Sequence, residues 1–553
     1  MYRQVYDPVG GSLGVSAIFA VLPLIVLFVL LGGFRVKIQW AAVASLATAL
    51  LVALVAYSMP VGQALDTAAL GAVFGFFPLV WLFLNALWVY NLTVDTGHFA
   101  VLRRSFASIS DDQRIQVILI AFCFGALLEA LAGSGAPVAI TGVMLAAIGF
   151  EPLKAAAAAL VANTAPVAFG AIGLPVTTLA AITGLPVSDL ADMTGRQVPV
   201  LALFVPLLLV LMTDGRRGVR QAWPAAAVGG LAFALTQFAA SNFISYQLAD
   251  VFASLIATGA IMALLRVWAP RERLAAGVLP SRPAVAGGAT HDPAFERDVA
   301  ARDEGPDSRR RVLEAYAPYL AIIVVVGLAQ IGPIKSALDS LTLEFGWPGL
   351  DVTDSKGEAV SAATYAFNWA SAAGSLLLLS GVVTAVILRI SPVQAARTYA
   401  RTLNQLKWPM FTVMTVLALA YVMNLSGQTV TLGQWLAGAG GVFAFLSPIL
   451  GWVGTAISGS DTSSNALFGS LQTAAATKAD LAPVLTAAGN GSGGVIGKMI
   501  SPQNLAIGAA AVGLAGREGD LFRRVVGWGL LLLAVMVVIV GLQSTPVLSW
   551  MVP

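Results

Sequence analysis

Apolar residues occur along this chain in long unbroken runs rather than in alternation with polar residues. A run of about 20 apolar residues is long enough to cross a bilayer as a helix. A membrane β-barrel would instead alternate with a period of two. The pattern predicts single spans near 13–32, 39–58, 68–92, 197–212, 222–242, 249–267, 313–331, 366–388, 408–425 and 523–542. Two further regions, 115–190 and 433–515, mix polar with apolar residues and predict a more complex path.

Basic residues predict the orientation, because cytoplasmic loops carry an excess of Lys and Arg. Threading the spans puts all the basic clusters on one side, so we expect both termini to face outward. The clusters are RVK (35–37), RRSFASISDDQR (103–114), DGRRGVR (214–220), RISPVQAARTYARTLNQLK (389–407) and REGDLFRR (517–524). The stretch 268–312 falls on the same side. It is rich in Ala, Pro, Gly and charge, which is typical of a flexible linker.

Composition agrees with a membrane chain. Of 553 residues, 58% are hydrophobic and only 11% are charged, whereas soluble domains carry roughly 25% charged residues. The single cysteine, Cys123, excludes an internal disulfide framework and a cysteine metal cluster. Both histidines, His98 and His291, fall outside the apolar runs, which argues against a histidine relay. We expect no cofactor and no nucleic-acid partner.

The two complex regions resemble each other. CFGALLEALAGSG (123–135) aligns with ILGWVGTAISGSD (449–461), and NTAPVAFGAIGLP (163–175) aligns with NGSGGVIGKMISP (490–502). The first copy is entered from the cytoplasmic side and the second from outside. This is the signature of inverted-topology repeats, which place substrate near the bilayer midplane in broken helices. A channel could also carry such repeats.

Each copy holds two polar interruptions. The stretches AGSGAPVAI and ISGSDTSSN have the small, turn-forming residues of a re-entrant hairpin tip. Non-helical backbone at membrane depth survives only where protein buries it or water reaches it. Asn163–Pro166 and Asn490–Gly494 are interpreted as unwound spans. The helix start at Asp461 offers free N–H donors that suit a carboxylate ligand.

Three charges lie in or beside these motifs: Glu129, Asp461 and Lys498. A charge at mid-bilayer costs at least ~2.5 kcal/mol, so intramembrane charges are functional candidates by default. A desolvated carboxylate can carry a proton at neutral pH, which makes Glu129 and Asp461 the candidates for proton coupling. The candidates for substrate binding are Ser134, Gly135, Asn163, Thr164, Ser460, Ser463, Ser464, Asn465, Asn490, Ser492 and Lys498.

Each candidate also has a purely structural interpretation. Asp461 could be a helix cap satisfied by its own backbone. Lys498 could be a snorkelling or ion-paired residue. Glu129 could pair with a neighbouring hydroxyl or lysine. Serine and threonine are common helix-packing residues, so each hydroxyl taken alone is more often structural.

The motifs resemble those of the L-lactate permease family. The resemblance is carried by CFGALLEALAGSGAPVAITG, VANTAPVAFGAIGLP, GSDTSSNALFGSLQ and GGVIGKMISPQNLAIGAAAVGL, with YDPVG and LSWMVP near the two ends. It spans essentially the whole chain. It implies a bacterial inner-membrane symporter that takes up L-lactate, D-lactate and glycolate with protons. It also implies kinship with the ion-transporter superfamily, whose members use paired hairpins and an elevator-like movement.

The chain departs from the family pattern at the first tip. The family usually shows Gly-Phe-Gly there and Glu-Gly in the preceding helix, whereas this chain has Gly133-Ser134-Gly135 and Ala130 after Glu129. An aromatic ring at that tip could shape or seal the pocket. The departure therefore bears on which acid is preferred.

The predicted fold is an all-α polytopic membrane protein. It has about 12–14 transmembrane segments in two inverted-topology repeats, each with a re-entrant hairpin and a broken helix. The predicted divisions are scaffold spans 1–114 and 313–432, transport repeats 115–195 and 433–516, connecting spans 196–267, a linker 268–312 and a final span 517–553.

The favoured function is proton symport of 2-hydroxymonocarboxylates across the lipid bilayer. The alternatives are a passive weak-acid channel and a sodium-coupled carboxylate carrier. An enzyme ranks last, since the sequence offers no nucleophile–base pair or nucleotide-binding loop. The sequence leaves an oligomer open.

Overall fold

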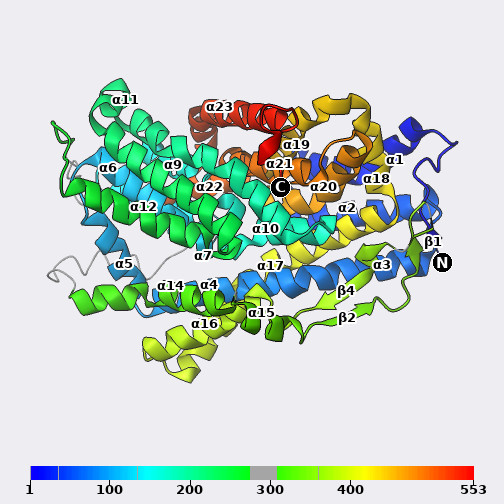
Figure 1. Ribbon diagram of the computed structural model, residues 1–553, viewed down its shortest axis with the longest axis horizontal. Helices are drawn as coiled ribbons and strands as arrows, with labels where there is room; N and C mark the ends of the chain where they lie inside the picture. Colours follow the sequence, from blue (N-terminus) through cyan, green and yellow to red (C-terminus); the bar gives the residue numbers. More distant parts are fainter. Residues whose placement is uncertain are drawn as a thin grey trace.

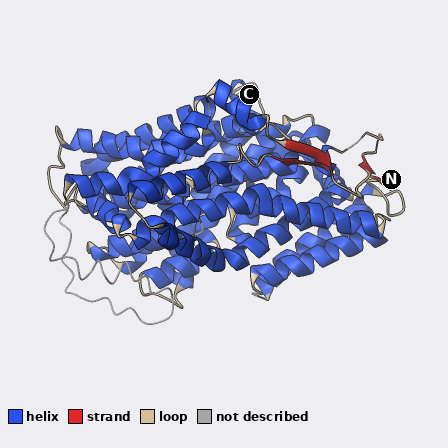
Figure 2. Ribbon diagram, turned by 90° about the horizontal axis from the view of Figure 1, so that it is seen from below, coloured by secondary structure: helices blue, strands red, loops and turns tan. Residues whose placement is uncertain are grey.

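The computed structural model describes residues 2–34, 36–131, 133, 135–274, 308–329, 331–355, 357–358 and 360–553. Most of the predicted linker, residues 275–307, therefore lies outside the described residues. Within the described part the chain is almost entirely helical (Figure 2). The helices up to the first polar region are α1 (Leu13–Phe28), α2 (Ile38–Val55), α3 (Val61–Phe74), α4 (Trp81–Asp95) and α5 (His98–Ala107).

The first polar region and the spans behind it follow. Their helices are α6 (Gln113–Val117), α7 (Gly125–Leu131), α8 (Ala136–Ala147), α9 (Pro152–Ala162), α10 (Gly170–Thr183), α11 (Val187–Phe243) and α12 (Ala249–Leu265). Short π-helices η1 (Val29–Gly33), η2 (Gly75–Val80) and η3 (Ile118–Phe124) continue α1, α3 and α6. Short 3₁₀ turns η4 (Val167–Phe169) and η5 (Tyr246–Leu248) precede α10 and α12.

The second half of the chain also contains both long and short helices. Its helices are α14 (Arg309–Ala329), α15 (Gly332–Asp339), α16 (Ala373–Ile387), α17 (Pro392–Leu425), α18 (Gln428–Leu436), α19 (Phe443–Ser458), α20 (Asp461–Lys478), α21 (Pro483–Gly497), α22 (Pro502–Ala511) and α23 (Glu518–Gln543). The 3₁₀ turns are η7 (Ser361–Ala363), η8 (Ala437–Val442), η9 (Lys498–Ile500) and η10 (Ser549–Met551).

Two small sheets form at one end of the molecule. The strand β1 (Tyr2–Arg3) pairs in parallel with β3 (Val352–Thr353). The strand β2 (Leu343–Gly346) pairs antiparallel with β4 (Thr364–Phe367). The sequence pattern predicted no strands, since strands of two to four residues are too short to show a period of two.

Among the described residues, ten helices are long and apolar enough to cross a membrane, or eleven if the bent pair α9–α10 counts as one span. The predicted 12–14 segments included shorter pieces. At 1.5 Å per residue, α8 and α16 are about 18 and 22 Å long, short of the ~30 Å hydrocarbon core. Conversely, α11 holds both predicted spans 197–212 and 222–242, separated by non-helical backbone at Asp214 and Gly215.

Helices from the two halves of the chain pack in two layers (Figure 1). In one layer α17 lies against α2, α3 and α4, and α16 lies against α4 and α14. In the other layer α19, α20 and α21 pack on one another, with α10 against α20 and α11 against α21. The layers also contact each other, through α17 and α18 against α20 and through α4 against α10, and the division into scaffold and transport repeats stays a prediction.

The first polar region folds as predicted into a helical hairpin and a bent span. The arms α7 and α8 pack together, with Gly133 and Gly135 between them in the chain. The bend between α9 and α10 is 61°, at the predicted break Asn163–Pro166.

The second polar region differs from the prediction at one place. Its hairpin, α19 and α20 around Gly459–Ser460, is present. The stretch Asn490–Gly494, however, is not unwound, because α21 runs without interruption from Pro483 to Gly497. The break comes later, at Lys498–Ser501.

The glycines of that stretch serve close helix packing instead of a break. A Cβ on Gly493 would lie 1.9 Å from the backbone oxygen of Pro448, and one on Gly451 would lie 1.8 Å from that of Asn490. Small residues let transmembrane helix backbones approach in this way. The chain therefore uses a glycine-rich helix to bring α21 against α19.

Gly451→Ala is expected to lower the midpoint of thermal unfolding in detergent. The new methyl group would clash with the backbone oxygen of Asn490, which cannot move aside by a side-chain rotation. The overpacking should therefore lower the free energy of unfolding by about 3 kcal/mol. Gly259→Ala on α12 is the matched control, since nothing lies within 4 Å of its added Cβ. A Gly451→Ala protein that melts with the control would contradict the close packing of α19 and α21.

An ion cluster holds the chain where it enters the first hairpin. Arg114 is 1% exposed. It donates hydrogen bonds to Asp112, Gln221 and the backbone oxygen of Glu272, and forms an ion pair with Asp214. Burial alone would raise the pKa of Asp112, but hydrogen bonds, chiefly from the Arg114 side chain, hold it below its usual value. The cluster ties the start of α6 to α11 and to the chain behind α12.

Candidate functional site

The two hairpin tips lie against the same short helix, α22. Gly135, with φ of +85°, faces Ile507, and its added Cβ would lie 2.5 Å from that side chain. Gly459, with φ of +78°, accepts a hydrogen bond of 3.2 Å from Asn504 Nδ2. The Oδ1 atom of Asn504 would lie 3.3 Å from a Cβ on Gly135, so one side chain reaches both tips. The positive φ values explain why both tips need glycine.

A buried ion pair joins the two repeats beside these tips. Lys498 Nζ, at the break after α21, lies 2.6 Å from Glu129 Oε1 on α7. Glu129 is 3% exposed and Lys498 is 6% exposed. Asn163, at the break after α9, donates a hydrogen bond of 2.9 Å to Glu129 Oε2. Residues predicted separately from their motifs therefore meet at one point, and each comes from a hairpin arm or a helix break.

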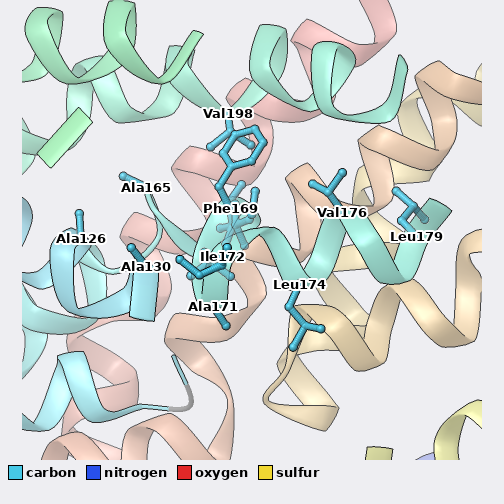
Figure 3. Close-up of a cluster of buried hydrophobic side chains, with 14 of the residues drawn as sticks. Ala126, Ala130, Ala165, Phe169, Ala171, Ile172, Leu174, Val176, Leu179 and Val198 are labelled. Atoms are coloured by element: carbon cyan, nitrogen blue, oxygen red, sulfur yellow. The ribbon is translucent and has the colours of Figure 1, made fainter. Parts of the chain in front are cut away.

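The backbone next to Glu129 is strained. Ala171 and Ile172 have φ of 44° and 55°, a left-handed conformation that residues with a Cβ seldom adopt. Gly170 must be glycine, because its added Cβ would lie 2.9 Å from Glu129 Oε1. Strain of this kind clusters at functional sites. Apolar side chains surround the break, among them Ala126, Ala130, Phe169, Ile172 and Val198 (Figure 3).

Asp461 lies near this pair without joining it. It is 3% exposed, and it is close enough to Lys498 for their charges to interact. The Thr455 hydroxyl approaches the carboxylate and interacts with it, but among the described residues no hydrogen bond of ordinary geometry reaches either carboxylate oxygen. The interpretation of Asp461 as a self-satisfied helix cap is wrong. Ser460 is the cap, and its side chain accepts a hydrogen bond from the Ser463 backbone N–H.

Other predicted binding residues already have partners inside the protein. Thr164 donates to Val161 O, and Ser464 donates to Gly451 O. Asn465 accepts from Asn490 at 2.9 Å and donates to Pro175 O. Ser492 donates to Gln197 at 2.7 Å. These residues fasten the helices around the site, and their role in binding stays a prediction. Ser134 lies outside the described residues.

Sequence reasoning missed two side chains that belong to this centre. Asn504 follows the helix-starting Pro502, and only its contact with both tips marks it out. Asp250 is 1% exposed on α12 and interacts electrostatically with Glu129. The signal for Asp250 was present, because an acid just inside an apolar run is unusual.

Two helical hairpins that meet on a short helix, with a buried ion pair between a hairpin arm and a helix break, fit the class of multi-span membrane transporters. The chain belongs to the L-lactate permease family, whose family model matches residues 16–547. This confirms the resemblance found in the sequence. Members of that family are transporters and not enzymes, and the chain is a multi-pass protein of the bacterial inner membrane.

Curated relatives match over the full length. The glycolate permease GlcA of Escherichia coli K12 is 40% identical, over 98% of each chain. The L-lactate permease of Bacillus subtilis 168 is 40% identical and that of Escherichia coli K12 is 39% identical, each over 100% of both chains.

Solved structures are more distant. The YdaH transporter of Alcanivorax borkumensis is 14% identical, with a TM-score of 0.42, over 85% of this chain and 86% of its own. MtrF of Neisseria gonorrhoeae is 14% identical, with a TM-score of 0.46, over 86% of this chain and 83% of its own. The family assignment rests on the family model and the sequence relatives.

Proposed function

We propose that this chain imports L-lactate and related 2-hydroxymonocarboxylates, D-lactate and glycolate among them, by symport with protons. The substrate would bind near the bilayer midplane, between the two hairpin tips and the two broken helices. The relatives named as L-lactate and glycolate permeases support the substrate class. The protein's own geometry supports the coupling.

The observation that carries the proposal is the ion pair between Glu129 and Lys498. A buried charge without a partner is costly, so Lys498 needs an anion at every stage. A substrate carboxylate can replace Glu129 on Lys498 if Glu129 takes up a proton at the same time. The site then stays neutral before and after binding. This exchange ties one proton to each anion.

The charge count also predicts the driving force. A lactate anion and one proton together move no net charge, so the pH gradient drives uptake and the membrane potential does not. A second proton would add ~2.3 kcal/mol per 100 mV. Asp461, whose carboxylate has no hydrogen bond of ordinary geometry among the described residues, is the other residue proposed for proton coupling. If it carries a second proton, uptake should also respond to the membrane potential.

Burial of the site supports alternating access. Glu129, Lys498 and Asp461 are all closed off from the surface, so a substrate from water can reach them only if the surrounding helices move. The arrangement of the helices in two layers (Figure 1) is compatible with an elevator-like movement of the layer that holds α19, α20 and α21. We propose that movement for this chain.

Uptake of labelled L-lactate into proteoliposomes tests the proposal. An inside-alkaline pH gradient is imposed across the proteoliposome membrane, and the membrane potential is clamped. Transient accumulation that an uncoupler collapses and excess glycolate blocks is the expected result. Equilibration that ignores the pH gradient would indicate a passive facilitator. Accumulation that follows a sodium gradient would indicate a sodium-coupled carrier.

A further inference from the structure

A third buried carboxylate lies behind the ion pair. Asp250 is in the first turn of α12, and only 1% of it is exposed. Its Oδ1 accepts a hydrogen bond of 2.8 Å from Gln237 Nε2 on α11. Its Oδ2 has no hydrogen-bond partner in the part of the chain that the structure describes, and neither has Gln237 Oε1. A purely structural carboxylate would be expected to have both oxygens satisfied.

Asp250 interacts with a charge of the same sign. The helix α7 packs against α12 and brings Glu129 close enough for the two carboxylates to repel each other. The other elements packed on α12 present neutral or weakly titrating groups: Gln237 from α11, Cys123 from η3 and Tyr246 from η5. Lys498 is engaged by Glu129. Glu129 has the Lys498 cation as its partner, whereas Asp250 has only the Gln237 amide, so the protonated form of Asp250 is the one favoured by its surroundings.

The same amide connects Asp250 to the bent span. Gln237 Nε2 also donates a hydrogen bond of 3.1 Å to Ala165 O. Ala165 lies in the break between α9 and α10, where backbone carbonyls lose their helical partners. The Gln237 side chain therefore joins Asp250 by hydrogen bonds to the break between α9 and α10. The same break carries Asn163, which donates a hydrogen bond to Glu129.

The predicted orientation places Asp250 on the outer side of the membrane. The basic cluster 214–220 is predicted to be cytoplasmic, so the turn between α11 and α12 faces outward. Asp250 follows that turn directly. A proton that enters from outside would reach this residue on its way to Glu129.

We propose that Asp250 relays the transported proton between the external side and Glu129. The protonated carboxyl of Asp250 passes its proton to the Glu129 carboxylate as the substrate anion takes over Lys498. The Asp250 carboxylate that remains then takes up a proton from external water. This role rests on the proposed proton symport. It makes Asp250 a proton-carrying residue of that reaction, with Gln237 as its positioning residue.

Asp250→Asn separates the relay from a structural role. Asparagine keeps the oxygen that accepts from Gln237 but cannot give up a proton. We expect accumulation of labelled lactate driven by the pH gradient to fall about 100-fold, the contribution of a positioned proton-transfer group. In exchange of internal for external lactate, Glu129 keeps its proton while one lactate replaces another on Lys498. Exchange therefore needs no proton from Asp250 and should keep the wild-type rate. Asp250→Glu should recover part of the accumulation.

Ser254→Ala is the matched control. Ser254 lies one turn further along α12, is fully buried and donates only to Val251 O, so the variant tests helix packing without touching the relay. It should behave as wild type in both assays. Lactate-induced proton movement, followed with a pH dye, should be lost in Asp250→Asn and present in the control.

Three results would overturn the inference. One is Asp250→Asn protein that accumulates lactate as wild type does. Another is the loss of exchange together with accumulation in folded Asp250→Asn protein, which would make Asp250 a binding or packing residue. The third is an Asp250→Glu variant no better than Asp250→Asn. A wild-type protein that exchanges lactate but ignores the pH gradient would instead refute the proposed symport itself.

Discussion

Lys498→Met should abolish lactate uptake and lower the stability of the protein. Methionine has similar length but no charge, so it leaves Glu129 buried without its partner at 2.6 Å. Removing one member of a buried ion pair costs about 3–5 kcal/mol. It also removes the cation that would hold the substrate carboxylate. Uptake in proteoliposomes and thermal unfolding in detergent measure the two effects.

The double variant Glu129→Gln with Lys498→Met is the control for stability. Replacing both members of a buried pair is often close to neutral, so the double variant should melt near wild type while it still fails to transport. Glu129→Gln alone should lose the response to the pH gradient. Normal pH-dependent uptake by either single variant would contradict the assignment of this pair to binding and coupling.

Gly494→Ala should abolish uptake by displacing Asp461. The added methyl group would lie 2.0 Å from Asp461 Oδ1 and 2.8 Å from Thr455 Oγ1. Since no rotamer of alanine avoids this contact, the carboxylate must leave its place near Lys498. Asp461→Asn keeps the shape and removes the charge, and it should also abolish acid-driven uptake. Labelled lactate uptake at imposed pH gradients measures both.

Gly491→Ala is the matched control for Gly494→Ala. It lies one turn earlier in α21, and its added Cβ would make only ordinary contacts, the nearest at 3.4 Å from Asn465. The same gain in helix propensity, up to about 1 kcal/mol, applies to both variants. Uptake should therefore survive in Gly491→Ala. Equal uptake in the two variants would show that the position of Asp461 does not matter for transport.

The sequence predicted those elements of the site that short stretches of polar residues mark within the apolar runs. Both hairpin tips, the break after Ala162 and the three charged residues were found from polar interruptions in apolar runs. The break assigned to Asn490–Gly494 was wrong. Glycine in a membrane helix can mean either a bend or a close helix contact, and only the neighbouring helix decides between them.

Two features of the centre depend on contacts that no local pattern contains. Glu129 and Lys498 are 369 residues apart in the chain, and their pairing was one of several open interpretations. Asn504 looks like an ordinary residue in the first turn of a helix until its contact with both tips is seen.

By itself the sequence determined the membrane class, most of the spans, the polar tips and the family, because length, hydropathy and turn-forming residues act within short stretches of chain. The tertiary structure alone decided which charge pairs with Lys498 and that α22 joins the two tips. It also decided that Asp461 and Asp250 keep carboxylate oxygens without hydrogen-bond partners among the described residues. The physical reason is that burial, electrostatic pairing and hydrogen-bond satisfaction depend on the distances between segments, which arise only when the two repeats pack together.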